Sequence, residues 1–283
     1  MTGCYIRIKD SLKSLAPKEQ KVAEFILEFP EEAMHMSIGE LAQTCATSNA
    51  SVVRLCKSVG YSGFKELCRV LTEELNQQSS IVYEEIHPGD SIDAIVKNVC
   101  MSNMKAIEST LSLLDMQTLD RAVDALCKAP RIDFYGAGSS GLVAKDASNK
   151  FLRINKITLS NPDPHEQILA ATSLRKDDVA VLLSYSGETR DTIETAEVVK
   201  ATEATLITIT KFGKSQLSEM ADIKLFTSSS EAMIRSGPMG SRIGQLTMVD
   251  ILYTAVSSRL YDEIKPYLDK TRLAAQRKHS GKN

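Results

Sequence analysis

The chain has 283 residues, 43% of them hydrophobic and 25% charged, which is enough for two ordinary domains with separate cores. Its formal net charge of -2 and pI near 6.1 exclude nucleic-acid binding through overall positive charge, so any DNA-binding charge must be local. The N-terminus lacks a signal-peptide pattern, and no apolar run approaches the ~20 residues of a membrane span. We therefore expect a cytoplasmic protein that makes no membrane contact.

Residues 1–76 show only helical patterns and are predicted to form an all-α domain. Five short helices are expected, the second beginning at Pro17 and stopping before Pro30. Ser37 and Glu40 have the spacing of a capping box, which predicts a third helix that ends near 45. Ser48 is placed to cap a fourth helix that runs to Gly60, and a fifth carries apolar residues from 64 to 75.

Six cysteines lie far apart, without a C-x-x-C pair or histidines at zinc-ligand spacing. We expect small hydrophobic residues in a reducing compartment, with no disulfide and no metal site. The six are Cys4, Cys45, Cys56, Cys68, Cys100 and Cys127.

Residues 77–90 are polar or extended in pattern and are predicted to be a linker. Helices are expected near 91–113 and 116–128, and from 131 onward β-rich runs alternate with helical segments. This alternation predicts a second, α/β domain over 91–283, with a doubly wound, five-stranded parallel sheet of the flavodoxin type. The expected strands cover 132–135, 157–159, 179–184, 206–210 and 223–226, and two helices from 241 onward close the chain.

The third and fourth helices have the dimensions of a helix-turn-helix, whose second helix enters the DNA major groove. Between 48 and 69 basic residues outnumber acidic ones, whereas the preceding residues hold more acids. This favours one basic side on a neutral domain, although a plain helical hairpin in a bundle has the same spacing. The expected DNA-binding residues are Ser48, Asn49, Ser51, Val52, Arg54, Lys57 and Lys65.

A glycine-rich loop follows the first strand and matches G-x-G-x-x-G over 136–141. Such a loop lets backbone N–H groups approach a phosphate at a helix N-terminus. A dinucleotide site also needs an acidic residue about 20 residues later, and 156–161 contains none. The missing acid counts against NAD, and no cofactor is expected.

A second donor-rich loop, 184–189, follows the third strand. It contributes the hydroxyls of Ser184, Ser186 and Thr189 around a turn made possible by Gly187. Clustered O–H and N–H donors suit a phosphomonoester without a metal, and neighbouring parallel strands bring both loops to one edge of the sheet. The sequence therefore predicts a phosphate site. Glu188 and the pair His165 and Glu166 are further candidates, although the residues favour a His–Glu pair with no ligand role, because an isolated pair lacks an orienting motif.

Gly138-Ser139-Ser140 and Ser184-Tyr185-Ser186-Gly187-Glu188-Thr189 resemble the two phosphate-binding signatures of the SIS (sugar isomerase) domain. Residues 37–66 resemble the N-terminal domain of the RpiR family of bacterial regulators, and 241–252 resemble its late SIS helix. The resemblance implies a homodimer or homotetramer in which a phosphorylated sugar or sugar acid alters binding to double-stranded operator DNA. It also implies that Ser140 and Ser184 contact this effector, with Ser139, Ser186 and Thr189 completing the cradle. Tyr185 stands where isomerases often carry a smaller or amide residue, which leaves the sugar open.

Two functions remain. The first is a DNA-binding regulator of carbohydrate metabolism, with no catalytic residues. The second is a sugar-phosphate isomerase or lyase on the same fold, which needs a general base as well as a phosphate cradle. An enzyme has no use for the first 75 residues, which favours the regulator.

Overall fold

The computed structural model describes residues 3–77, 89–228 and 239–280. The chain divides into two compact units. One contains Met1–Leu113 with Lys211–Ser215 and Ser228–Gly240, and the other contains Leu114–Thr210, Gln216–Thr227 and Ser241–Asn283. Most of the predicted linker 77–90 lies outside the described residues, and the predicted domain boundaries stay predictions. No helix in the described part of the chain is both long and apolar enough to cross a membrane.

The N-terminal region is all helical, as predicted, but it contains one helix more than expected. Pro30, read from the sequence as a stop, begins α3, because a proline is tolerated in the first turn, where its missing N–H has no partner to lose. Phe29 separates it from the preceding helix with φ −127° and ψ 60°. The elements are α1 (Cys4–Ser11), a 3-10 turn (Leu12–Ser14), α2 (Pro17–Glu28), α3 (Pro30–His35), α4 (Ile38–Thr44), α5 (Asn49–Ser58) and α6 (Phe64–Gln77).

One apolar core holds these helices together. Its fully buried members include Ile8, Ile26, Leu41, Leu55 and Leu67, so every longer helix of the region contributes at least one side chain. Burial of each such side chain contributes about 1.5–3 kcal/mol relative to exposure. The short α4 and α5 are therefore fixed in place mainly by tertiary packing and by their caps.

The turn between α4 and α5 is closed by backbone bonds. Thr47 N–H donates to the Ala42 carbonyl at 2.8 Å and Ala46 N–H to the Gln43 carbonyl at 3.0 Å, a Schellman arrangement. Ala46 adopts a left-handed φ of 48°, a position where glycine is usual. The absence of glycine explains why the sequence predicted a turn here but not its type.

The sheet has the order β2-β1-β3-β4-β5, the flavodoxin-like order, as predicted. The registered pairs β1·β2, β1·β3 and β3·β4 are parallel. Each strand begins and ends within one residue of its expected position: β1 (Arg131–Gly136), β2 (Ile157–Leu159), β3 (Val179–Leu183), β4 (Thr205–Lys211) and β5 (Ile223–Thr227).

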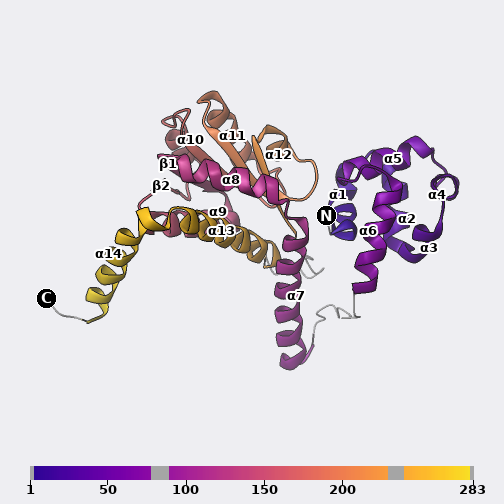
Figure 1. Cartoon of the computed structure of the whole chain (residues 1–283), viewed down its shortest axis with the longest axis horizontal. Helices are drawn as coiled ribbons and strands as arrows, with labels where there is room; N and C mark the ends of the chain where they lie inside the picture. The colour runs from indigo at the N-terminus through magenta and orange to yellow at the C-terminus, as the bar shows by residue number, and fades with distance from the viewer. Residues whose placement is uncertain (1–2, 78–88, 229–238, 281–283) are drawn as a thin grey trace. The chain divides into compact units, whose positions relative to one another are not determined.

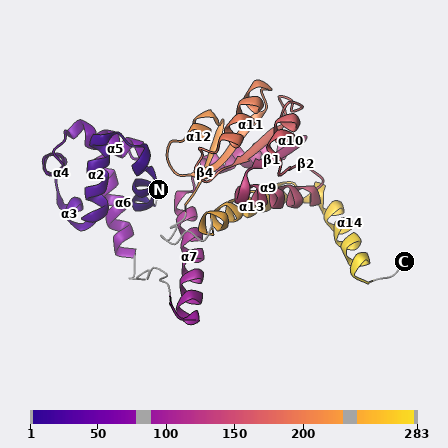
Figure 2. The same ribbon diagram turned by 180° about the vertical axis from the view of Figure 1, so that it is seen from behind.

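Helices cover both faces of this sheet, which explains why its central strands are apolar throughout. One face packs Phe134 and Val181 against α8 (Met116–Lys128), α9 (Gly138–Arg153) and α13 (Gly240–Arg259). The other packs Tyr135 and Leu182 against α10 (Pro164–Ala171), α11 (Arg190–Ala201) and α12 (Gln216–Met220). Figures 1 and 2 show α9 and α13 side by side beneath the sheet.

Two further helices complete the described chain. α7 (Ile92–Leu113) is the longest helix, and α14 (Tyr261–Ser280) follows α13 after a short break. The sequence placed α7 correctly and predicted two closing helices from 241 onward, which are α13 and α14, each of 20 residues.

Candidate functional site

The two donor loops meet at the carboxyl edge of the sheet because of strand register. Gly136, the last residue of β1, pairs with Leu183, the last residue of β3. The loops 136–141 and 184–189 therefore start side by side, where the strand order reverses direction between β1 and β3. In open α/β sheets this switch point is where ligands bind.

The glycines of the first loop serve different purposes. A Cβ on Gly136 would lie 2.9 Å from the Leu183 carbonyl oxygen, and one on Gly141 would lie 2.9 Å from the Gly136 oxygen. These two glycines allow strand, loop and helix to pack closely. Gly138 has a left-handed φ of 56°, and no heavy atom lies within 4 Å of its virtual Cβ. The backbone at Gly138 is thus open to an approaching ligand.

Ser140 is buried in the first turn of α9 and is already hydrogen-bonded. Its hydroxyl lies 3.1 Å from Nε2 and 3.2 Å from Oε1 of Gln245, a side chain of α13 that is itself 1% exposed. Ser139 precedes it and is half-buried. The sequence pointed to Ser140 but gave no signal for Gln245, because a polar residue on an amphipathic helix is ordinarily solvent-facing.

Ser184 organises the second loop. Its hydroxyl accepts from the Gly187 N–H at 3.2 Å and lies 3.1 Å from the Thr189 hydroxyl, and the residue is 3% exposed. Gly187 takes a left-handed φ of 70°, which lets the loop turn back. Ser184 and Thr189 are thereby brought together, whereas Ser186 is exposed and its hydroxyl accepts from the Glu188 N–H.

The helices after these two loops begin without side-chain caps. The N-cap positions of α9 and α11 are Ala137 and Thr189, and neither side chain bonds to the first turn of its helix. An N-terminus carries about half a positive charge on N–H groups that no helical carbonyl accepts. Two such ends at one sheet edge, with nearby hydroxyls, can hold a phosphate.

The third loop of this edge, after β2, is closed by its own residues. Asp163 caps α10 and accepts from the N–H groups of His165 at 2.8 Å and Glu166 at 3.1 Å. The side chains of His165 and Glu166 are exposed, and Glu166 accepts a hydrogen bond from Asn161. This loop has no vacant N–H cluster comparable to those of α9 and α11.

A buried amide ties the third loop to the first. Gln167 is 2% exposed, and its Nε2 donates to the carbonyl of Gly136 at 3.0 Å and of Asn161 at 2.7 Å. It therefore holds the ends of β1 and β2 at a fixed separation. The sequence gave no reason to select Gln167, since its role depends on carbonyls 31 and 6 residues away. Glu188, the remaining candidate, is exposed and accepts from the Gln216 N–H at 3.0 Å.

In the N-terminal region, Ser37 and Glu40 form the predicted capping box of α4. Ser37 N–H donates to Glu40 at 2.6 Å and Glu40 N–H to the Ser37 hydroxyl at 3.2 Å. The Ser37 amide and hydroxyl lower the pKa of the Glu40 carboxyl. Ser48 caps α5 by accepting from the Ser51 N–H at 3.3 Å. Both helices of the helix-turn-helix thus begin where the sequence placed them.

The candidate DNA-binding residues of α5 divide by exposure. Ser48 and Asn49 are exposed at its N-terminus, and Lys57 is exposed near its C-terminus. Ser51 and Val52 are both fully buried. The Ser51 hydroxyl is hydrogen-bonded to the Ser48 hydroxyl and accepts from Arg54, and Val52 belongs to the apolar core. These contacts indicate that Ser51 and Val52 stabilise the position of α5.

Arg54 is exposed over 57% of its side chain but is not free. Its Nε donates to Oε1 of Glu19 on α2 at 3.1 Å, and Nη2 donates to the Ser51 hydroxyl at 2.9 Å. Glu19 is largely buried, so it forms a fixed partner that limits the positions open to the guanidinium group. The sequence gave no indication of the contact between Arg54 and Glu19, because Glu19 lies 35 residues earlier.

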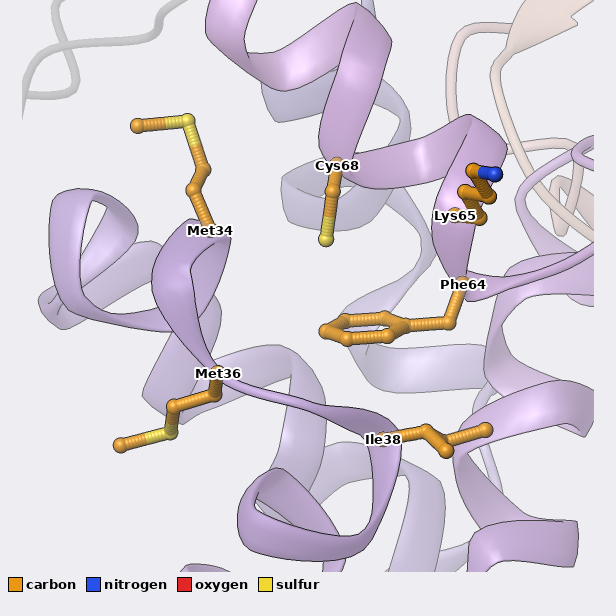
Figure 3. Close-up of a pocket in the computed structure, with 6 residues that line it drawn as sticks. All are labelled: Met34, Met36, Ile38, Phe64, Lys65 and Cys68. Atoms are coloured by element: carbon orange, nitrogen blue, oxygen red, sulfur yellow. The ribbon is translucent and has the colours of Figure 1, made fainter.

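Lys65, the last candidate, lies on α6 at the rim of an apolar pocket of about 460 Å³. Figure 3 shows the Phe64 ring and the Cys68 thiol directed into this space, while the Lys65 amine points away. The opposite wall is formed by Met34 of α3, Ile38 of α4 and Met36, which lies between these two helices. Lys65 is exposed and accessible to a phosphate backbone, whereas the pocket beside it is apolar.

Family models match both regions of the chain. A helix-turn-helix domain of the rpiR family matches residues 2–78, and a SIS domain matches 125–255. Relatives are similar over nearly the whole length. An HTH-type transcriptional regulator of Caldanaerobacter subterraneus subsp. tengcongensis is 41% identical over 96% of each chain. HexR of Pseudomonas aeruginosa, also an HTH-type transcriptional regulator, is 34% identical over 93% of this chain and 92% of its own.

The fold also matches a solved structure along its full length. The Vibrio vulnificus NanR protein complexed with ManNAc-6P is 25% identical, with a TM-score of 0.60 over 96% of this chain and 97% of that chain. A sugar isomerase domain of an RpiR transcription factor from Sphaerobacter thermophilus, 18% identical, has a TM-score of 0.58 over 63% of this chain and 98% of that chain. The second likeness concerns the fold alone.

Proposed function

Because this chain belongs to the RpiR family of helix-turn-helix transcriptional regulators with a SIS domain, we propose that a phosphorylated sugar or sugar acid controls its binding to operator DNA. The effector occupies the crevice between the loops 136–141 and 184–189. One observation carries the proposal: two uncapped helix N-termini and the buried hydroxyls of Ser140 and Ser184 lie at the same edge of the sheet.

The ligand is assigned by its chemistry. A phosphomonoester carries about two negative charges and several acceptor oxygens, which match the N–H groups and hydroxyls of the two loops. The Ser139, Ser140, Ser184, Ser186 and Thr189 side chains provide the hydroxyls, and Gly138 and Gly187 open the backbone. The NanR protein, similar over the same length, is complexed with ManNAc-6P, a sugar phosphate, and this supports the same ligand class here.

The available acids and bases favour a binding site over an enzyme. An isomerase needs a base poised at the sugar carbons. His165 and Glu166 lie in the first turn of α10, where Asp163 accepts from the His165 N–H and Asn161 donates to the Glu166 carboxylate. Glu188 is bonded to the Gln216 amide. We propose that these residues line or border the crevice without catalysis, and turnover of a sugar phosphate by the purified protein would contradict this.

The DNA-binding surface is proposed to centre on the exposed end of α5. Ser48 and Asn49 stand at its N-terminus, where a recognition helix meets base edges, and Arg54, Lys57 and Lys65 supply positive charge. Ser51 and Val52 support the helix from below. Such a regulator acts in the cytoplasm as a homodimer or homotetramer, since paired half-sites call for paired recognition helices.

The decisive test is Ser184→Ala. The substitution removes the hydroxyl that accepts from Gly187 and meets Thr189, so the response of DNA binding to the effector should disappear while DNA affinity alone stays within a factor of two. DNA binding is measured by fluorescence anisotropy with and without a panel of sugar phosphates. Ser258→Ala, at an exposed position of α13, is the matched control and should respond like wild type. If Ser184→Ala responds normally, the site lies elsewhere.

A thermal-shift screen identifies the effector itself. A ligand at 100 times its Kd stabilises the folded protein by ~2.7 kcal/mol, and the panel should contain sugar phosphates, phosphorylated sugar acids and N-acetylated amino-sugar phosphates. Stabilisation by a panel member in wild type, and its loss in Ser184→Ala, is the expected pattern. Stabilisation of both proteins alike would place the ligand outside the proposed crevice.

A further inference from the structure

α7, the longest helix among the described residues, carries an apolar stripe on its surface. On α7 the side chains of Ile92, Val96, Met104, Ile107 and Leu111 are each between 43% and 76% exposed. Cys100 is exposed between them and is the sole exposed cysteine of the six. Their spacing of three or four residues places them on one face, over roughly 30 Å of helix. A continuous exposed apolar face of this length marks an interaction surface.

The stripe is not the face that α7 turns to the protein's own core. That face carries Ala106, Ser109, Thr110 and Leu113, which are buried. The Thr110 hydroxyl accepts from the Ser228 N–H at 3.3 Å, which ties this face to Ser228 within the same compact unit. The helix thus has one face committed within the chain and a second apolar face that faces solvent.

Four of the six residues of the stripe are placed symmetrically along the helix. Ile92 and Leu111 lie equally far from the midpoint between 101 and 102, and the same holds for Val96 and Ile107. Two copies of α7 laid antiparallel about this midpoint therefore place large apolar side chains opposite one another, as a two-fold interface requires. The centre of the stripe then brings Cys100 opposite Asn103 of the partner.

The charges beside the stripe fit the same arrangement. Lys97 directly follows Val96, and Glu108 directly follows Ile107, so both project from the same edge of the stripe, and both are exposed. An antiparallel two-fold pairing joins like edges, which brings each Lys97 beside the partner's Glu108. A parallel pairing would leave the two at levels about 16 Å apart along the helix axis. The charges therefore favour the antiparallel arrangement.

We propose that α7 is a self-association surface, on which a second copy of this chain packs its own α7 antiparallel, Val96 against Ile107. This pairing is independent of the effector crevice. It supplies a two-fold axis, and two linked helix-turn-helix regions are what a palindromic DNA site needs.

The first test changes the stripe. Val96→Glu/Ile107→Glu should reduce the mass of the full-length protein by half in light scattering coupled to size exclusion, because it places four carboxylates in the centre of the pairing. Leu169→Glu, a like change at an exposed leucine of α10, should keep the wild-type mass. An unchanged mass of the α7 variant, or an equal loss in both, would overturn the proposal. A sugar-phosphate thermal shift retained by the α7 variant separates this test from that of the effector site.

The second test fixes the orientation without disturbing the fold. In a Cys100→Ser background, Ile92→Cys/Leu111→Cys should form a covalent dimer on mild oxidation. Ile92→Cys alone should not, because antiparallel pairing puts its two thiols roughly 28 Å apart along the helix axis, much further than a disulfide can span. Cross-linking of the single variant would show a parallel pair, and no cross-linking of the double variant would show that the stripes do not meet. Either result contradicts the proposal.

The third test uses charge. Lys97→Glu should raise the dimer Kd several-fold by setting two carboxylates side by side, and Lys97→Glu/Glu108→Lys should restore it by exchanging the partners. Failure of the double variant to recover affinity would contradict the antiparallel register, since the exchange restores attraction only where the two edges meet.

Discussion

The helices of the helix-turn-helix and the helices of the crevice begin in opposite ways. α4 and α5 begin at the caps Ser37 and Ser48, whose hydroxyls accept from the Glu40 and Ser51 N–H groups of the first turn. α9 and α11 follow Ala137 and Thr189 and carry no such caps. The uncapped N-termini of α9 and α11 leave N–H groups from which an anion could accept hydrogen bonds, as we propose for the effector phosphate. The neighbouring α10, capped by Asp163, follows the first pattern.

The two regions also use hydroxyls differently. In α5, the buried Ser51 hydroxyl is hydrogen-bonded to Ser48 and Arg54, so the residue stabilises the fold. In the crevice, Ser140 and Ser184 are buried but bonded to other side chains that can exchange a partner, namely Gln245 and Thr189. In the proposed function, the crevice is preorganised around a position for phosphate, while the exposed residues of a well-packed helix contact DNA.

The largest expected effect tests whether the two regions fail separately. Leu55→Ala empties a fully buried position of α5 and should lower the free energy of unfolding of the N-terminal region by ~2–5 kcal/mol, with loss of DNA binding. Sugar-phosphate stabilisation of the crevice should persist. Denaturant unfolding measures the free energy of unfolding, and thermal shift measures the stabilisation by sugar phosphate. Ser58→Ala, exposed on the same helix, is the control, and simultaneous loss of both activities in Leu55→Ala would contradict independent regions.

A smaller effect is expected at the surface of α5. Arg54→Ala should weaken operator binding by ~1–3 kcal/mol, more selectively among sequences if the guanidinium reads a base and more uniformly if it holds phosphate. Glu19→Gln should weaken it less, because Arg54 keeps its bond to Ser51. Anisotropy titrations over a range of salt concentrations measure both. Unchanged affinity of Arg54→Ala at low salt would move the recognition surface away from this residue.

The smallest expected change in stability tests the difference in capping directly. Ala137→Asp should supply α9 with the cap that it lacks and stabilise the protein by about 0.5–2 kcal/mol. It should also abolish sugar-phosphate binding, because the new carboxylate occupies the same N–H groups. Thermal melting with and without ligand reports both effects, with Ala137→Gly as a variant that retains binding. An Asp variant that still binds phosphate would show that the α9 N-terminus is not used.

Local sequence patterns determined much of this protein. Capping residues, proline and apolar periodicity located α4, α5 and every strand of the sheet, because those signals act over a few residues. They also identified the loops 136–141 and 184–189, whose glycines and hydroxyls are contiguous. They failed at Pro30, where a proline that can end one helix begins the next, and at Ala46, which takes a glycine's conformation without being glycine.

Contacts between distant residues were decided only by the tertiary structure. Gln245 meets Ser140 across 105 residues, and Glu19 meets Arg54 across 35, so no window of sequence contains either pair. Ser51 and Val52 are likewise buried, although their positions near the start of the helix had made them candidates for DNA contact. Sequence fixes which groups a loop or helix offers, but which of them remain available depends on what the folded chain packs against them.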